Sequence, residues 1–433
     1  MPNPFFFGNP VPPEQFIGRS HELRRIVGRI LNQGQSTAVV GEPRSGKTSL
    51  LLYLKAPETR DELYGERSDQ LLFSYLDAHT FGNTFTQVEF WKHALRPLRI
   101  KLTHAASPLG QAYHTCREDQ FGTFVLERLL AQMRADNLRL VLLVNQFDVL
   151  LHHEVLNCTE FFGGLRALAS RSRGALALVI GSRRPLTTLN RETQDLSRTG
   201  SPYFNFMDEV ILRPLSSKAV SKLLDRAGEL FTTEDRRYLS RVAGGHPYLL
   251  QMAASEMWMA YSEGIDDRFR RWQQVGERLY GTAALTLSDT WRLWSSAMKR
   301  AFTSVAIADV SSLLEQRKFY MLPLIRDARR DCGPELRMLC TQGFISKDDA
   351  MPTGYHVRPQ AFLWWMADEI VRMARDEKPV EAWLRAQELG VMLTKGEKEQ
   401  LHEAVRTIGE MLRGGATILI ETAAKGIGAA LIN

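Results

Sequence analysis

Short hydrophobic runs alternate with longer amphipathic segments through the first half of the chain. The runs are rich in Val, Leu and Ile, and polar or glycine-containing turns bound them, which is typical of buried β-strands. Strands that alternate with helices predict an α/β fold with a parallel sheet covered on both faces. The expected strands are 36–40, 71–77, 138–145, 175–181 and 209–212. The expected helices of this half are 20–32, 85–102, 118–136 and 159–172.

From Ser216 onward the hydrophobic positions follow a helical period instead. The exception is 344–357, where two apolar stretches flank the polar turn 347–353 and predict a β-hairpin. Helices on both sides of this hairpin favour a winged-helix-like module. The predicted divisions are an extended proline-rich strap at 1–15, an α/β domain at 16–215, a helical domain at 216–290, a winged-helix-like domain at 291–374 and a short helical tail at 375–433.

The segment from Gly41 to Thr48 reads GEPRSGKT and matches the G-x-x-x-x-G-K-[ST] phosphate-binding loop. It follows a predicted strand and precedes an apolar run that starts a helix, so backbone N–H groups would surround a polyphosphate at a helix N-terminus. Lys47 is expected to contact the β- and γ-phosphates, and the Thr48 hydroxyl to bind Mg²⁺. The predicted cofactors are therefore ATP or ADP with Mg²⁺. The loop residues predicted to bind the nucleotide are Gly41, Pro43, Arg44, Ser45, Gly46, Lys47, Thr48 and Ser49.

The strand predicted at 138–145 should end on an acidic pair that holds Mg²⁺ and orients the attacking water. Asn145 and Gln146 stand there instead. An amide has no negative charge to oppose Mg²⁺ and too little basicity to accept a proton from water. We therefore assign Asn145 to metal binding and Gln146 to the catalytic position, and expect slow or absent hydrolysis. A natural switch with weak turnover and an introduced isosteric block are both open as origins of the amide pair.

Three further residues are candidates for this site. Arg183 follows the strand predicted at 175–181, where an arginine can stabilise charge in the transition state; a solvated arginine pair is the alternative. Asp148 is the acid nearest to the amide pair, and we expect it to serve as a turn residue rather than a metal ligand. Pro247 begins a predicted helix after a Gly-Gly-His turn, where it can press on an adenine face.

Composition narrows the choice of partners only slightly. The net charge of +6 on 433 residues is compatible with nucleic acid, but also with an ATP-binding protein that has no such partner. Basic residues in the winged-helix-like module could bind DNA, with a solvated face or a protein contact as the alternative. The four cysteines lack disulfide or zinc spacing and indicate a reducing compartment. With neither a secretory signal nor a spanning segment expected, the predicted location is cytoplasmic.

The two ends of the chain carry apolar segments. Phe5, Phe6 and Phe7 lie in the strap, which we expect to pack on the domain surface; docking to a neighbouring subunit is the alternative. Residues 416–433 carry only Glu421 and Lys425 as charged side chains. This tail is either a helix docked on the core or a segment for partner or membrane contact, and the second interpretation is favoured.

Five segments together resemble the STAND branch of the AAA+-related ATPases, which are signal-transduction NTPase switches and include prokaryotic relatives of immune receptors. The resemblance extends over roughly 16–370, and its most specific element is the Gly-Gly-His-Pro-Tyr run. The segments that carry it are 16–19 (FIGR), 41–48, 140–148, 213–216 (RPLS) and 244–251 (GGHPYLLQ).

This resemblance implies a nucleotide-binding domain, a helical lid and a winged-helix domain, and an open form that oligomerises. It places Ile17 and Gly18 beside the base, Pro247 near adenine and Arg183 at the end of the sensor strand. The resulting hypothesis is an ATP-dependent switch that forms a homo-oligomer and signals through its tail to an effector protein, in antiphage defence or programmed cell death. The alternatives are a DNA-associated AAA+ ATPase that uses the winged helix, and a membrane-active effector that uses the apolar tail.

Overall fold

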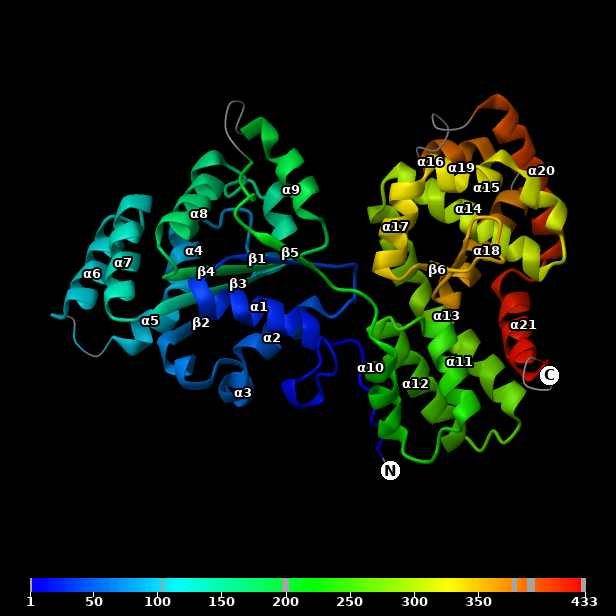
Figure 1. Ribbon diagram of the computed structural model, residues 1–433, viewed down its shortest axis with the longest axis horizontal. Coiled ribbons are helices and arrows are strands. Elements are labelled where there is room, and N and C mark those ends of the chain that lie inside the picture. The colour runs from blue at the N-terminus through cyan, green and yellow to red at the C-terminus, as the bar shows by residue number, and fades with distance from the viewer. Residues whose placement is uncertain are drawn as a thin grey trace. The chain divides into compact units, whose positions relative to one another are not determined.

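The computed structural model describes residues 2–102, 104, 106–196, 202–375, 380–387 and 394–429 (Figure 1). Contacts divide the chain into two compact units. The first, called the α/β unit below, comprises Pro10–Glu42 and Gly46–Leu212. The second, called the helical unit, comprises Met1–Asn9, Pro43–Ser45 and Arg213–Asn433.

A five-stranded parallel sheet forms the centre of the α/β unit, with the strand order β2-β3-β4-β1-β5. Each strand lies within one residue of its predicted bounds, so the α/β prediction is confirmed. The carboxyl ends of parallel strands meet at one edge, which brings the ends of β1, β3 and β4 together. The strands are β1 (Thr37–Val40), β2 (Leu71–Asp77), β3 (Arg139–Asn145), β4 (Leu176–Ser182) and β5 (Asp208–Ile211).

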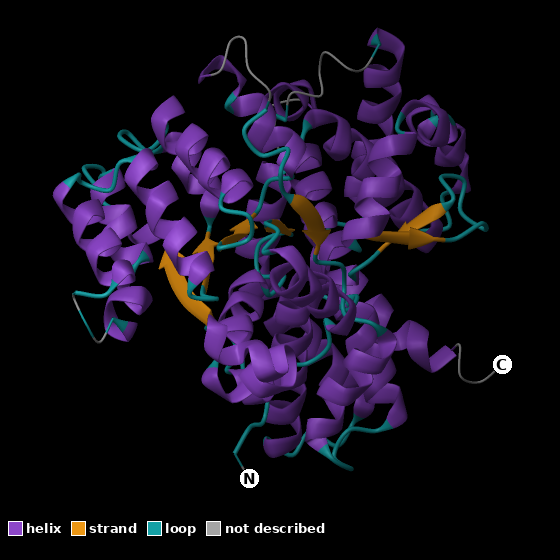
Figure 2. Cartoon of the chain, turned by 60° about the vertical axis from the view of Figure 1, so that its left-hand side comes forward, coloured by secondary structure: helices purple, strands orange, loops and turns teal. Residues whose placement is uncertain are grey.

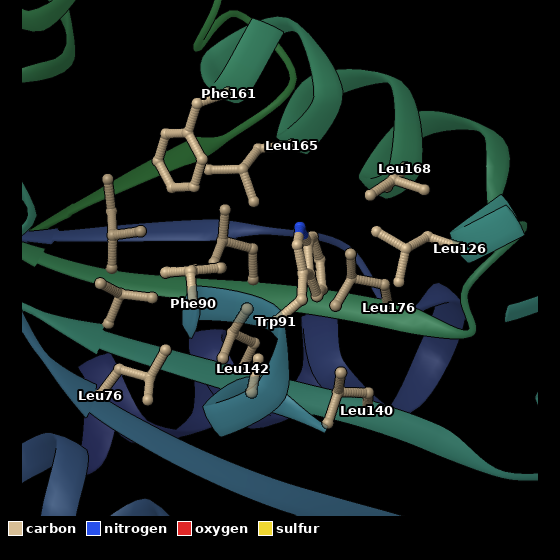
Figure 3. Close-up of a cluster of buried hydrophobic side chains, with 14 of the residues drawn as sticks. Leu76, Phe90, Trp91, Leu126, Leu140, Leu142, Phe161, Leu165, Leu168 and Leu176 are labelled. Atoms are coloured by element: carbon tan, nitrogen blue, oxygen red, sulfur yellow. The ribbon is translucent and has the colours of Figure 1, made fainter. Parts of the chain in front are cut away.

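Both faces of the sheet are covered by helices. Successive side chains of a strand point to opposite sides, so each strand contributes to the hydrophobic core on either face. Leu140 and Leu142 of β3 join one hydrophobic core, and Val141 and Leu143 join the other. Helices α4 (Gln87–Ala94), α7 (Thr123–Ala135) and α8 (Thr159–Arg171) contribute to the first core, part of which Figure 3 shows. Helices α1 (Ser20–Gln33), α2 (Lys47–Lys55) and α3 (Arg60–Tyr64) contribute to the second.

Two predicted helices of this unit have different bounds. The expected helix 85–102 is divided into α4 and α5 (Arg96–Lys101), since Pro97 at the second helical position has no N–H to continue a helix. The expected helix 118–136 begins only at Thr123, because Gln120 and Phe121 adopt left-handed φ angles of 49° and 59°. Helix α3 and helices α6 (Pro108–Glu118) and α9 (Leu186–Glu192) were not predicted.

Helices dominate the second unit, and its strands form a single hairpin (Figure 2). The predicted hairpin is present as β6 (Ile345–Lys347) paired antiparallel with β7 (Tyr355–Val357). The winged-helix assignment of the surrounding helices stays a prediction. The helices before the hairpin are α10 (Ser217–Leu224), α11 (Thr233–Ala243), α12 (Pro247–Ser262), α13 (Arg268–Leu293), α14 (Ser296–Leu313), α15 (Pro323–Arg326), α16 (Ala328–Asp331) and α17 (Gly333–Gln342). Those after it are α18 (Gln360–Arg375), α19 (Val380–Ala386), α20 (Lys395–Met411) and α21 (Ala416–Ala429).

Residues 2–9 of the N-terminal strap pack within the helical unit. Phe5 is buried, stacks on Phe231 at 5.5 Å between ring centroids and meets the edge of Trp258. The Phe6 backbone N–H donates to the Gln251 side chain at 3.2 Å. Three aromatic rings and a backbone hydrogen bond therefore hold this extended segment against α12 and its neighbours.

The C-terminal helix α21 packs against α13 and α18 of the same unit. Leu419 and Ile420 are buried, and Asp368 of α18 accepts a hydrogen bond from the Ala416 N–H at the start of the helix, at 2.6 Å. The docked-helix interpretation thus describes residues 416–425, and the end of the predicted tail, 430–433, lies outside the described residues. Among the helices of the described ranges, none combines the length and hydropathy needed to cross a bilayer.

Candidate nucleotide-binding site

The loop after β1 has the backbone of a phosphate-binding loop. Gly46 adopts a φ of 96° directly before α2, a conformation that favours glycine, and an added Cβ would meet no atom within 4 Å, so conformation rather than space requires the glycine. The Gly41 N–H donates to the Ser182 carbonyl at 3.2 Å, which fixes the loop to the end of β4. No side chain of the described part of the chain caps α2. Its first N–H groups are therefore suited to bind an anion.

Lys47, the first residue of α2, lies folded over this loop. Its Nζ donates to the carbonyls of Gly41 at 2.7 Å and Glu42 at 2.8 Å, and the residue is buried. Burial lowers the pKa of Lys47 to about 8, while the negative charges of Glu42 and Asp148 act in the opposite direction. Carbonyl groups compensate a buried ammonium less well than an anion does. A phosphate in the loop would therefore gain a strong, desolvated partner in Lys47.

The two residues predicted to bind the metal lie together. The Thr48 hydroxyl donates to Asn145 Oδ1 at 3.3 Å, and Asn145 is 1% exposed. Asn145 Nδ2 in turn donates to Asp77 Oδ2, 3.0 Å away at the end of β2. Hydroxyl, amide and carboxylate oxygens are hard donors of the kind Mg²⁺ prefers. The residues present thus fit Mg²⁺ held jointly with nucleotide phosphates, and Thr48 and Asn145 are the side chains that would hold it.

Gln146 occupies the position after Asn145 in a left-handed conformation, with φ of 54°. Its Oε1 is buried, and within the described ranges it has no hydrogen-bond partner. A buried hydrogen-bond acceptor without a partner destabilises the fold by about 1–3 kcal/mol. A water or a ligand group that donates to this oxygen would remove that penalty. An amide oxygen can accept a hydrogen bond from a water and orient it, but it cannot take up the proton.

Arg183 and Asp148 form an ion pair at the end of β4. Arg183 Nε lies 2.9 Å from Asp148 Oδ2, and the Arg183 backbone N–H donates to Asp148 Oδ1 at 3.1 Å. Asp148 is 2% exposed, whereas about a third of the Arg183 side chain is exposed. Both oxygens of the Asp148 carboxylate thus bind Arg183 at the turn after β4, as expected for a turn acid. The Arg183 guanidinium remains partly accessible.

The remaining candidates of the α/β unit lie beside α2. The Ser49 hydroxyl accepts a hydrogen bond from the Val11 N–H at 3.0 Å, which fixes the N-terminal segment to this helix. Ile17 and Gly18 precede α1, and Gly18 has a left-handed φ of 78°. Their neighbour Phe16 stacks on Tyr53 of α2 at 4.5 Å between ring centroids. The structure thus brings this segment to α2; its contact with a base stays a prediction.

Several predicted residues group with the helical unit. Pro43 and Ser45 flank Arg44, whose guanidinium lies 5.0 Å above the Tyr248 ring and whose Nη1 donates to the Gly8 carbonyl at 2.8 Å. Pro247 is the first residue of α12, directly before that tyrosine. Its role near adenine stays a prediction, as does nucleotide contact by Pro43, Arg44 and Ser45.

One residue of the site was missed in the sequence. Asp77 ends β2, and nothing in its local sequence places it next to Asn145, which lies 68 positions away along the chain. The signal that could have found it is the run Leu71–Asp77, a buried strand that ends on an acid. The carboxyl ends of parallel strands are where ligands bind in open α/β sheets. No group of three or more His, Cys, Asp and Glu side chains that could hold a metal alone was found within the described ranges.

Comparison with known proteins identifies the fold but not the family. No family model and no curated protein matches the chain. A Walker-type ATPase of Pyrococcus abyssi is similar in structure, with a TM-score of 0.50 at 16% identity, over 82% of this chain and 96% of that chain. The ORC2 protein of Aeropyrum pernix in its ADPNP and ADP complexes gives a TM-score of 0.45 at 14% identity, over 81% of this chain and 95% of that one. Drosophila ORC bound to DNA gives 0.39 at 16% identity, over 82% and 88%. The chain has the fold of an α/β P-loop ATPase followed by a helical C-terminal region.

Proposed function

We propose that this chain binds ATP or ADP with Mg²⁺ in the 41–48 loop and acts as a nucleotide-dependent switch of the STAND type. The observation that carries the proposal is the set of polar contacts of buried Lys47 and Asn145, with Thr48 beside them, at the carboxyl edge of a P-loop sheet. A buried ammonium is costly in a protein unless an anion accompanies it, and Lys47 has only carbonyl partners among its hydrogen bonds. A phosphate bound in the loop would offset that cost.

Slow hydrolysis is part of the proposal. Asn145 and Gln146 can hold a metal-bound nucleotide and orient a water, but neither carries the carboxylate that removes a proton from it. Slow turnover suits a switch, because the bound nucleotide then persists long enough to set the conformation. The ion-paired Arg183 could stabilise developing charge at the γ-phosphate together with Lys47.

Phosphate contacts at this site can supply the free energy needed to shift the switch from one state to the other. Moving a two-state equilibrium from 1:99 to 99:1 takes about 5.5 kcal/mol of differential affinity. Charge-assisted hydrogen bonds contribute about 1.5–3 kcal/mol each, so two to four phosphate contacts that exist in only one state are enough. In this proposal the ATP-bound state assembles into a homo-oligomer and signals to an effector partner, in antiphage defence or programmed cell death.

DNA binding is the second candidate, and the charges of the winged-helix-like module weigh against it. Arg300, Arg326 and Arg330 pair with acidic side chains of the same unit, and the hairpin turn carries Asp348 and Asp349. A turn that enters a DNA groove should be basic rather than acidic, because phosphate contacts dominate affinity. The module is therefore better suited to a protein contact. Further basic residues of this module that could bind DNA are Lys299, Arg317, Lys318, Arg329 and Arg337.

Signalling through the tail requires release of α21, since its apolar face packs within the helical unit. This packing gives the tail a defined off state, held by Asp368 at its N-terminus and by Leu419 and Ile420 along its length. A partner or membrane that takes up the same face would compete with α13 and α18. Effector contact by the tail is therefore proposed only for the ATP-bound form.

Light scattering after size exclusion, with ATP, ADP and no nucleotide, tests the switch. The expected result is a larger particle with Mg²⁺ and ATP than in the other two conditions. The Lys47→Ala variant should keep one size throughout, because it lacks the phosphate contact. A single, unchanged size for the wild-type chain in all three conditions would contradict assembly on ATP binding.

A further inference from the structure

A Mg²⁺ site places anionic oxygen ligands opposite the cation. Position 145 at the end of β3 offers only an amide, and the nearest following acid, Asp148, is neutralised by Arg183. The adjacent strand β2 pairs with β3 in register, Asp77 opposite Asn145. The Asp77 carboxylate therefore lies next to the Asn145 amide, with 3.0 Å between Asn145 Nδ2 and Asp77 Oδ2.

We infer that Asp77 is the charged member of the metal site: from β2 it supplies the negative charge that position 145 lacks, and it orients Asn145 toward the cation. This inference rests on the proposed nucleotide and Mg²⁺ binding. Asp77 is here a positioning residue, since Asn145 lies between it and Thr48. Its role is to place a negative charge next to the neutral ligand Asn145, through the hydrogen bond between the two side chains.

The chemistry of the two side chains fixes the orientation of the amide. An ionised carboxylate can only accept hydrogen bonds, so it must face the NH₂ group of Asn145. The amide oxygen is then forced to the opposite side, where Thr48 lies at 3.3 Å. An asparagine without such a neighbour could present either end, and its NH₂ group would repel a cation. The carboxylate thus makes Asn145 a metal ligand, and it also strengthens the dipole of the amide.

The two oxygens of Asp77 have separate partners. Oδ1 accepts from the His79 N–H at 3.1 Å and caps the short turn after β2. Oδ2 faces Asn145, and the Tyr75 hydroxyl lies 3.5 Å from the same oxygen. The turn alone would be satisfied by one oxygen of a neutral asparagine. An isosteric change to asparagine therefore tests the charge while keeping the cap.

The test measures Mg²⁺ binding to the nucleotide complex. Full-length wild type and Asp77→Asn are saturated with a fluorescent ADP analogue in EDTA, and Mg²⁺ is then titrated in. Loss of an outer-sphere partner typically weakens a metal site by about 10- to 100-fold. We expect the Mg²⁺ concentration at half-effect to rise by about that factor in Asp77→Asn, with nucleotide affinity in EDTA unchanged. Equal Mg²⁺ dependence in the two proteins would overturn the inference.

A swapped variant, in which Asp77 and Asn145 are exchanged, distinguishes an effect of the charge on Mg²⁺ binding from an effect of the substitution on folding. In Asp77→Asn with Asn145→Asp, the carboxylate and amide exchange strands and the hydrogen bond between them reverses direction. Mg²⁺ affinity should return to the wild-type value or exceed it, because the charge is now on the inner position. The comparison variant is Tyr75→Phe, which removes a neutral hydroxyl that lies 3.5 Å from Asp77 Oδ2 and also hydrogen-bonds Asn145. It should weaken Mg²⁺ binding less than Asp77→Asn does, because no charge is lost.

The outcomes distinguish this inference from the proposed function. A wild-type chain that binds no nucleotide with or without Mg²⁺ overturns the proposed function. Nucleotide binding that is the same with Mg²⁺ and in EDTA leaves the nucleotide site standing and overturns the role of Asp77. A swapped variant that melts at the wild-type temperature yet stays as weak in Mg²⁺ as Asp77→Asn also overturns it, because the charge would then have no effect on the metal.

Discussion

Asp309 gives the helical unit a pH dependence that can be worked out from its surroundings. The residue lies in α14, is 8% exposed, and accepts a hydrogen bond from the Val357 N–H of β7 at 2.5 Å. Burial raises the pKa of its carboxyl from 3.8 to about 7; the hydrogen bond from Val357 opposes the shift and the charge of Asp348 adds to it. The carboxyl is therefore protonated in the folded chain at a pH where it is ionised in the unfolded chain.

The sign and size of the effect follow from this difference. A folded-state pKa above the unfolded one contributes stability that is complete below about pH 4 and is lost as the pH rises to about 7. Each pKa unit corresponds to about 1.4 kcal/mol, so the full loss is about 4 kcal/mol. Asp309→Asn cannot ionise, and its amide oxygen can still accept from Val357. The variant should be more stable than wild type, and its advantage should grow by about 2–3 kcal/mol between pH 5 and pH 8.

Hydrogen exchange of the β6 and β7 amides, corrected for the intrinsic pH dependence, reports this local stability. His356 is a necessary control, because burial lowers its pKa and its contribution rises with pH over part of the same range. The comparison is therefore repeated in a His356→Gln background. Parallel profiles of wild type and Asp309→Asn from pH 5 to pH 8 would refute the reasoning.

Two further predictions concern hydrolysis and the tail. Asn145→Asp with Gln146→Glu should raise ATP turnover by at least about tenfold, because a general base typically contributes 10²- to 10⁴-fold; unchanged phosphate release would mean that these are not the catalytic positions. Gly276→Ala should loosen α21, because the added Cβ would lie 2.7 Å from Ile420 Cγ2 and 2.9 Å from the Tyr238 hydroxyl. Overpacking of this kind costs about 1–3 kcal/mol. Faster proteolysis of α21, reversed by adding Ile420→Ala, checks it, and unaltered cleavage would show that the tail does not depend on this contact.

Local patterns were enough to predict the sheet and the phosphate-binding loop. The strands of the α/β unit are continuous apolar runs, because both faces of a parallel sheet are buried. Such runs can be identified in the sequence without knowledge of the tertiary structure. Leu140 to Val144 is the clearest example, with every residue fully buried. The loop follows from one short motif whose glycine at position 46 is required by its φ of 96°.

Features that depend on neighbours distant in sequence were not predictable in the same way. Asp77 meets Asn145 only because β2 lies next to β3, and strand order cannot be read from periodicity. The docking of α21 depends on Gly276 of α13, where the missing side chain lets Ile420 approach. Helix bounds at Gln120 and Phe121 depend on left-handed backbone angles that neither residue type signals.

Calorimetric titration of the full-length chain with ATP and with ADP, each with Mg²⁺, tests the central claim most directly. The account predicts binding of one nucleotide per chain. It also predicts an affinity lower by about 10- to 150-fold in Lys47→Ala, since a charged hydrogen bond contributes about 1.5–3 kcal/mol. Absence of binding by either nucleotide, or an affinity that Lys47→Ala leaves unchanged, would contradict it.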